Sequence, residues 1–305
     1  MGCQLYHGFV GGLYENGTNS VPADHHQAGL ARAGAITPLD AVGTSSAAGK
    51  IVFLSIGMSN ASAEWRGSLG HDHPSEESFM GQAARHPCVN HSTLVIVDGA
   101  QRRQDAAGWL SPTAATYDVV AGRLSAAGVT EHQVQAVWLK SINARPTVAL
   151  PSRSADVYQN EAHLAKTVRA IRARYPRVQA VFLSSRTYAG YARTALHPEP
   201  YAYESGFAVK WLIQAQIDQM RNSGAVLDAN LGDLNYTTVA PWLAWAAYTW
   251  ADGMTPRSDG LSWQASDFSW DGVHPSRAGI EKVASTLMSS FLESPFATGW
   301  FRRRS

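Results

Sequence analysis

A serine and an Asp-x-x-His pair, far apart along the chain of 305 residues, have the types and surroundings of a nucleophile and its base. Ser59 stands in the stretch GMSN, directly after an apolar run at 51–56. Asp271 and His274 stand in the stretch DGVHP. On a tight turn, a carboxylate at this spacing can reach the Nδ1 proton of the imidazole and leave Nε2 free as a base. A serine hydroxyl becomes an effective nucleophile when such a base accepts its proton.

Each of these residues also has a purely structural interpretation. Ser59 or Asn60 could cap a helix that follows a strand, and Asp271 could cap the loop that enters the last helix. A serine in the first strand-to-helix turn, together with an Asp-x-x-His before the last helix, favours catalysis over two unrelated caps.

The elements that must position these residues can be read from the apolar runs. Continuous apolar runs without polar alternation are typical of strands that are covered on both faces, as in a parallel sheet. Four such runs lie at 51–56, 94–97, 134–139 and 178–183, and a weaker fifth strand is predicted at 225–231.

Helical stripes separate the predicted strands. Apolar residues recur at spacings of three and four within 117–127 and 164–175, and a C-terminal amphipathic helix is predicted from Ser276 onward. Alternating strands and helices indicate an α/β fold: a three-layer α/β/α, doubly wound, flavodoxin-like and mostly parallel sheet of about five strands. Residues 1–49 are predicted to wrap this sheet as part of the same domain, and 50–305 to form the catalytic domain.

Ligands of doubly wound folds bind at the carboxyl ends of the strands. Three loops are therefore expected to converge at one edge of the sheet: the loop of Ser59, the loop at 98–101 and the loop at 140–143.

These motifs resemble the SGNH, or GDSL-type, hydrolases, a family of esterases and lipases with a serine after the first strand and an Asp-x-x-His near the C-terminus. The resemblance extends from about Lys50 to Leu292. It implies an oxyanion hole made of the Ser59 amide, the Gly99 amide and the Asn143 side chain, because a tetrahedral oxyanion needs donors already aimed at it.

Two motifs depart from the usual family pattern. The first block reads Gly57-Met58-Ser59 where the family has Gly-Asp-Ser, and Asn60 makes it more similar to the Gly-Gln-Ser-Asn of the sialate O-acetylesterase-like branch. The third block lacks Gly-x-Asn-Asp, so Asn143 is assigned as the only asparagine that directly follows the third strand.

Aromatic residues are the candidates for substrate binding. Tyrosines and tryptophans are frequent after the fourth strand, and their flat rings suit sugars or aromatic esters, although many such rings are ordinary core. Tyr188, Tyr203 and Glu204 are predicted to bind substrate, since they belong to a long loop at 187–205, ahead of a helix at Gly206, that could cover the site.

Composition excludes several partners. Charged residues make up 16% of the chain and the formal net charge is +1, so nucleic acid and anionic membranes are poor candidates, and no run is long enough to span a bilayer. Cys3 and Cys88 could form one disulfide or remain two free thiols. The low charge and the export typical of the resembling family favour an extracytoplasmic origin.

Metal catalysis is not favoured. Two His-rich stretches, Asp24-His25-His26 and His71-Asp72-His73, lack the i, i+4 spacing of a zinc-binding pair and are expected in loops. We therefore expect no metal and no cofactor.

The sequence thus predicts a serine esterase that cleaves a small acyl ester, with acetyl on a carbohydrate as the leading substrate. The alternatives are an aryl or short-chain lipid esterase of the same fold, or a carbohydrate-binding protein whose site is degenerate, which the methionine before Ser59 would suggest.

Overall fold

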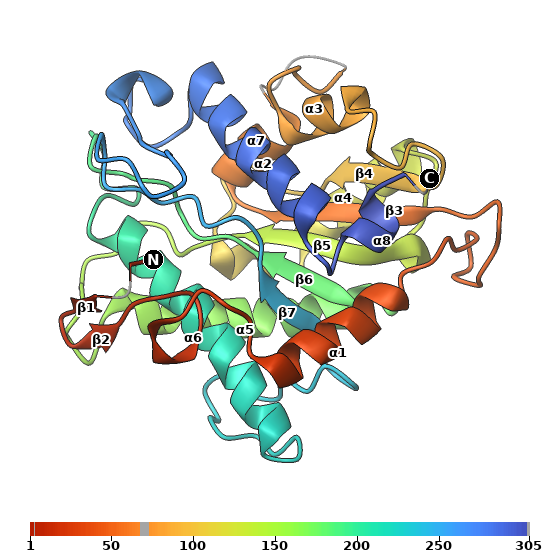
Figure 1. Cartoon of the computed structure of the whole chain (residues 1–305), viewed down its shortest axis with the longest axis horizontal. Coiled ribbons are helices and arrows are strands. Elements are labelled where there is room, and N and C mark those ends of the chain that lie inside the picture. Colours follow the sequence, from red (N-terminus) through yellow and green to blue (C-terminus); the bar gives the residue numbers. More distant parts are fainter. Residues whose placement is uncertain (3, 68–72, 304–305) are drawn as a thin grey trace.

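The computed structural model describes residues 1–2, 4–67 and 73–303 (Figure 1). A two-stranded antiparallel hairpin, β1 and β2, precedes a five-stranded parallel sheet. In chain order the helices and strands are β1 (Leu5–Tyr6), β2 (Phe9–Val10), α1 (Ala23–Gly34), β3 (Ile51–Gly57), α2 (Ser59–Arg66), α3 (Phe79–Arg85), β4 (Leu94–Asp98), α4 (Ala115–Ala126), β5 (Val134–Lys140), α5 (Asp156–Arg174), β6 (Ala180–Leu183), α6 (Tyr201–Arg221), β7 (Trp242–Trp245), α7 (Arg277–Glu293) and α8 (Thr298–Phe301).

The large sheet has the strand order β4-β3-β5-β6-β7, and all its neighbouring strands run parallel. After β3 the chain adds β4 next to one edge of β3, and it then returns to add β5 next to the opposite edge. The direction of winding therefore reverses between β3 and β5. This doubly wound α/β order confirms the predicted fold class, and its switch point is where such folds place ligands.

The four clear apolar runs form strands as predicted, but the predicted fifth strand at 225–231 is wrong. That segment is a turn that exposes Val226 and Leu227, whereas β7 supplies the fifth strand with all four residues buried. The run at β7 contains two tryptophans, which made it resemble an aromatic surface cluster rather than a strand covered on both faces.

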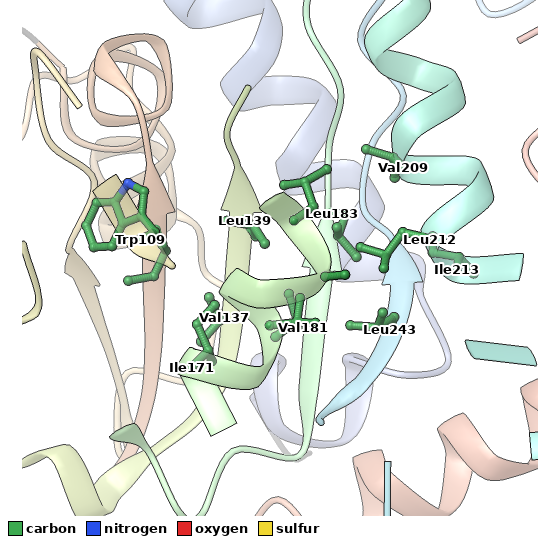
Figure 2. Packing of buried hydrophobic residues seen from close by; sticks show 14 of the residues in the cluster. Trp109, Val137, Leu139, Ile171, Val181, Leu183, Val209, Leu212, Ile213 and Leu243 are labelled. Atoms are coloured by element: carbon green, nitrogen blue, oxygen red, sulfur yellow. The ribbon is translucent and has the colours of Figure 1, made fainter. Parts of the chain in front are cut away.

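Helices cover both faces of the sheet (Figure 1). One face packs against α4, α5 and α6 through alternate strand residues such as Leu54, Val137 and Leu183, and Figure 2 shows side chains of β5, β6 and β7 gathered with those of α5 and α6. The other face packs against α2, α3, α7 and α8 through Phe53 and Phe182. The alternation explains why both faces of each strand are apolar.

The stretch Asp24-His25-His26, predicted to lie in a loop, instead belongs to the first turn of helix α1, which begins at Ala23. His25 is buried against β7, with its Nε2 2.7 Å from the Leu243 carbonyl oxygen, and its backbone carbonyl accepts a hydrogen bond from the Trp242 ring. Burial lowers the pKa of His25 to about 4, and the bond to the Leu243 carbonyl oxygen offsets only part of this effect. His25 is thus a neutral core residue of the helix that packs on β7.

The predicted C-terminal helix is confirmed as α7, and its N-cap is Ser276, whose hydroxyl accepts a hydrogen bond from the Gly279 amide. Cys88 is an exposed free thiol, while Cys3 lies outside the described residues. Within the described part of the chain, no helix combines the length and apolar character that crossing a membrane requires.

A buried ion pair joins β5 to α2 below the Ser59 turn. The Lys140 ammonium lies 2.7 Å from both carboxylate oxygens of Glu64, and both residues are fully buried. The Lys140 carbonyl also accepts a hydrogen bond from the Met58 amide. A buried pair of this kind contributes little net stability but is costly to break on one side, so it locks the helix to the strand.

Removing one member of this pair should be far more damaging than removing both. We expect Lys140→Met alone to lower the free energy of unfolding by about 3–5 kcal/mol, because Glu64 is left buried without a partner. The double variant Lys140→Met/Glu64→Leu should recover most of that loss. Urea denaturation of Lys140→Met, Glu64→Leu and the double variant measures the difference. A double variant whose loss of unfolding free energy equals the sum of the two single losses would contradict the interpretation.

Candidate active site

Three predicted residues meet at the carboxyl edge of the sheet. The Ser59 hydroxyl lies 2.8 Å from His274 Nε2, and His274 Nδ1 lies 2.5 Å from Asp271 Oδ2. Ser59 is the first residue of α2, whereas Asp271 and His274 belong to the turn before α7. The distance from the hydroxyl to the imidazole is within the range in which a base can accept the serine proton.

The Asp271 carboxylate is held by more than the imidazole. Its other oxygen, Oδ1, accepts hydrogen bonds of 3.0 Å from the Val273 and His274 amides. Burial would raise the pKa of Asp271, but the bonds from the His274 ring and from the two amides outweigh burial and lower its pKa below the usual value. The ionised carboxylate can therefore hold the imidazole in the tautomer that leaves Nε2 facing Ser59.

The turn that carries His274 is tied to the nucleophile helix through one carbonyl. The Val273 carbonyl oxygen accepts 2.9 Å from Asn60 Nδ2 and 3.3 Å from Arg186 Nη2, and both donor side chains are buried. Asn60 directly follows the candidate nucleophile Ser59. The start of α2 therefore positions the hydroxyl through Ser59 and the base through the bond of Asn60 to the His274 turn.

A second buried carboxylate organises the nucleophile turn from below. Asp98, at the end of β4, accepts hydrogen bonds of 2.7 Å from the Ser55 hydroxyl and 2.9 Å from the Ser62 hydroxyl, and Arg123 lies 3.3 Å away. Burial raises the pKa of Asp98 in spite of these partners. The network connects β3, β4 and α2 one turn below Ser59.

Gly57 has to be a glycine for this turn to form. Its φ is +147°, and a Cβ there would collide with the Lys140 carbonyl oxygen. The backbone of β3 can therefore approach β5 closely just before it turns into α2, which lifts Ser59 above the sheet.

A cavity of about 900 Å³ opens above the three residues. Its walls come from the loops that follow β3, β4, β5, β6 and β7, at the switch point between β3 and β5. Its lining includes Ser59, Arg102, Arg103, Arg186, Leu196, His197, Trp270, Asp271 and His274. The predicted convergence of loops at one edge is thus what the structure has.

Two of the residues predicted for the oxyanion hole are not brought to this cavity. The Gly99 amide donates to the Ser55 carbonyl oxygen at 3.0 Å and to the Ser55 hydroxyl at 3.1 Å, so it is engaged within the sheet. Asn143 turns towards α5, where its Oδ1 lies 2.7 Å from His163 Nδ1 and its Nδ2 donates weakly to Gln159. The departures from the family pattern at the third block correspond to this turned side chain.

The residues predicted for substrate binding lie outside the cavity as well. Helix α6 begins at Tyr201, earlier than predicted, so Tyr203 and Glu204 belong to its first turn rather than to a loop. Glu204 is buried and accepts from the Tyr6 hydroxyl and the Leu150 amide, and Tyr203 packs against Trp250. Tyr188 packs against Tyr191 and Trp250, away from the cavity.

The loop that holds Tyr188 still contributes to the cavity through other residues. Leu196 and His197 line it, and the Arg193 amide donates 2.8 Å to the Asp271 carbonyl oxygen. The second half of the loop thus lines the cavity, although nothing in the sequence pattern distinguishes Leu196 and His197, and its role as a cover stays a prediction.

Sequence reasoning also missed Arg186 and the arginines after β4. Arg186 is 1% exposed and lines the cavity three residues beyond the end of its apolar run, where the signal in the sequence is a charge at the carboxyl end of a strand. Arg102 and Arg103 are exposed at the cavity, directly after the predicted loop at 98–101.

The His-rich stretches do not form a metal site in the described residues. No group of three or more histidine, cysteine, aspartate or glutamate side chains there could hold an ion. His71 and Asp72, part of the second stretch, lie outside the described residues.

No protein-family model matches the sequence, and no curated protein matches it. Among solved structures, the chain is similar to an extracellular lipase from Streptomyces rimosus, with 16% identity, TM-score 0.33 and coverage of 79% of this chain and 99% of the lipase. It is also similar to a carbohydrate esterase family 2 enzyme with a carbohydrate-binding domain from Corynascus thermopiles, with 16% identity, TM-score 0.38 and coverage of 84% and 69%.

A third similar structure is a salicylyl-acyltransferase from a tetracycline biosynthetic pathway, with 15% identity and TM-score 0.39. The alignment covers 83% of this chain, which spans 58% of the length of the acyltransferase. Identities and TM-scores this low do not identify a reaction, so the function has to be inferred from the geometry of the site.

Asn60 and Asn143 provide a test of which asparagine serves the site. Asn60→Ala removes one of the two side-chain donors to the Val273 carbonyl, and the loss of such a bond, about 0.5–1.5 kcal/mol, should slow fluorophosphonate labelling of Ser59 by up to roughly tenfold. Asn143→Ala should leave the labelling rate within about twofold, because its side chain faces α5. Equal slowing of the labelling in both variants would contradict the assignment of Asn60, rather than Asn143, as the asparagine that supports the site.

Proposed function

We propose that the chain is a serine ester hydrolase that acts through an acyl-enzyme on Ser59. The observation that carries the proposal is the chain of hydrogen bonds at the cavity floor, 2.8 Å from the Ser59 hydroxyl to His274 Nε2 and 2.5 Å from His274 Nδ1 to Asp271. The arrangement supplies the three roles that such chemistry needs: nucleophile, base and orienting carboxylate. The motif resemblance to SGNH hydrolases agrees with this assignment.

Proton transfer can be followed atom by atom. His274 Nε2 accepts the proton of the Ser59 hydroxyl as the oxygen attacks the ester carbonyl carbon, and the imidazolium then donates that proton to the leaving alcohol oxygen. A water molecule then gives a proton to Nε2 as its oxygen attacks the acyl carbon. The bond between that carbon and the Ser59 oxygen breaks, and the imidazolium returns the proton to this oxygen, which releases the acid and restores the serine hydroxyl. Asp271 stays ionised and stabilises the imidazolium throughout.

The oxyanion is proposed to be held by the Ser59 and Arg102 amides. The Ser59 amide is the first of α2, where backbone N–H groups have no partner within the helix. The Gln101 amide donates 3.0 Å to the Gly57 carbonyl oxygen, which sets the next amide, that of Arg102, beside the nucleophile turn. This assignment replaces Gly99 and Asn143, whose donors are engaged elsewhere.

The substrate is proposed to be a small acyl ester, with acetyl on a carbohydrate as the leading case. Trp270 supports this, because its side chain lines the cavity, is 79% exposed and is adjacent to Asp271 in the chain. A large exposed indole at the rim of a site is a platform on which the apolar face of a sugar can stack. An aryl or short-chain lipid ester is the alternative, supported by the apolar Ile142 and Leu196 of the lining.

Fluorophosphonate labelling tests the nucleophile directly. The parent protein should be labelled at one residue, and Ser59→Ala should abolish both the labelling and the hydrolysis of p-nitrophenyl acetate, because no other hydroxyl of the described residues is paired with His274. Peptide mapping by mass spectrometry identifies the labelled residue. A parent protein that remains unlabelled would favour the carbohydrate-binding alternative, and labelling that persists in Ser59→Ala would refute the assignment of the nucleophile.

Trp270→Ala tests the substrate class. If the indole stacks on a sugar, its loss should raise the KM for an acetylated xylo-oligosaccharide by up to about tenfold, the value of a contact of 0.5–1.5 kcal/mol. The kcat for p-nitrophenyl acetate should remain unchanged, since the role assigned to Trp270 is to stack on the sugar and not to touch the reacting atoms. Equal effects on both substrates would favour the aryl or lipid ester.

A further inference from the structure

A second cavity, separate from the candidate active site, lies between helices α5 and α6. It has a volume of about 300 Å³, and the segment at 227–234 closes one side. The two helices pack against each other. None of the residues that line this cavity lines the cavity above Ser59.

Two acceptor groups in the side chains of the lining have no hydrogen-bond donor among the described residues. Glu161 is 9% exposed and makes no hydrogen bond or ion pair with any described residue, and the Oε1 atom of Gln214 is buried without a donor among those residues. Asp218 and Asp228 add two further carboxylates to the lining. A carboxylate on a residue this buried is expected to be paired, and Glu161 has no partner among the described residues, so the cavity offers it to a ligand that carries donors.

The donors of the lining are already used. Gln214 Nε2 donates 2.8 Å to Asp218, and Gln219 Nε2 donates to the Gly224 carbonyl oxygen and to Asp233. The lining contains no lysine, arginine or histidine. The cavity therefore combines negative charge with open acceptors, a combination that repels anions and leaves a neutral ligand's acceptors unpaired.

The nearest cations are engaged outside the cavity. Arg169, on α5, donates to the Leu231 carbonyl oxygen, and Arg221, at the end of α6, pairs with Glu15 and Asp24. Arg169 lies against Leu231 and Gly232 of the lining, but neither arginine is itself a lining residue or forms an ion pair with Glu161.

An aromatic wall completes the site. Trp211 lines the cavity and is stacked on Tyr158, with ring centroids 5.4 Å apart and an interplanar angle of 11°. The stack fixes the orientation of the indole, and an indole face attracts a cation or packs against methylene groups.

We propose that this cavity binds a small molecule or side chain that ends in a primary ammonium group. The Glu161 carboxylate accepts hydrogen bonds from the ammonium, and Trp211 packs against the adjoining methylene groups. A primary ammonium carries three donors and one positive charge, which matches the unsatisfied acceptors and the carboxylates of the lining.

Binding of an ammonium should be linked to a proton on Glu161. Burial, followed by repulsion from Asp228, raises the pKa of Glu161 to about 8. The other charged or titratable groups near this carboxyl are Asp218, Tyr158 and Arg169. The empty site holds a proton below pH 8 and releases it when the cation binds, so affinity should rise with pH until Glu161 is ionised.

Isothermal titration calorimetry with 1,5-diaminopentane tests the proposal. The parent protein should bind at pH 8.5, and Glu161→Gln should weaken binding about tenfold or more, as expected for losing a charge-assisted bond. Asp252→Asn is the matched control, because Asp252 is an exposed carboxylate outside the cavity. Absent binding by the parent, or equal affinities of Glu161→Gln and Asp252→Asn, would overturn the proposal.

Two further ligands test whether the charge is recognised and whether the occupant is a free amine or a protein side chain. 1-Pentanol, which keeps the methylene chain without the charge, should not bind; binding as tight as that of the diamine would overturn the proposal. N-acetyl-lysine methylamide, which presents the same ammonium on a side chain, should bind equally if the occupant is a protein side chain and more weakly if it is a free amine.

The pH dependence separates the proposed role from a structural one. Between pH 7 and pH 9 the affinity of the parent protein should rise roughly tenfold, because the ionised fraction of a group with a pKa of about 8 rises by that factor while the amine stays charged. The affinity of Glu161→Gln should be flat over this range. Trp211→Leu, which keeps the carboxylate, should weaken binding but retain the rise with pH; a flat parent profile would overturn the proposal.

Discussion

The site depends on one backbone carbonyl, that of Val273. It accepts hydrogen bonds from Asn60, which follows the candidate nucleophile, and from Arg186, which follows β6. A buried carbonyl that lost both donors would carry the full cost of desolvation, so the turn that holds His274 has a strong reason to stay against α2. Residues more than two hundred positions apart are thereby brought within hydrogen-bonding distance.

The charges below this carbonyl explain why the arrangement can be rigid. The Lys140–Glu64 pair joins α2 to β5, and Asp98 joins α2 to β3 and β4 through Ser55 and Ser62. Buried ionic groups of this kind add little net stability, but an alternative position of α2 would leave several of them unpaired. The sheet thus fixes the helix, the helix fixes Asn60, and Asn60 fixes the turn that carries the base.

Local patterns predicted four of the five strands of the large sheet, the last helix and the residues now found together at the cavity floor, because apolar periodicity and the Asp-x-x-His spacing are short-range signals. Partners that depend on how a side chain turns were not predictable. The Gly99 amide is engaged by Ser55, and the Asn143 side chain faces α5, although both follow the expected strands. The sequence predicts a loop at Tyr203 because no capping side chain precedes Tyr201 to mark the start of α6.

The methionine before Ser59 raised the possibility of a degenerate site, and the surroundings of the turn argue against it. Met58 is 6% exposed and lines the cavity, so it fills space where the resembling family has a carboxylate. The bonding that a carboxylate could give this turn is supplied instead by Asp98, from the end of the neighbouring strand, through the Ser62 hydroxyl. Since the nucleophile turn keeps an acidic anchor, the exchange at position 58 changes the polarity of the cavity floor without removing the support of Ser59.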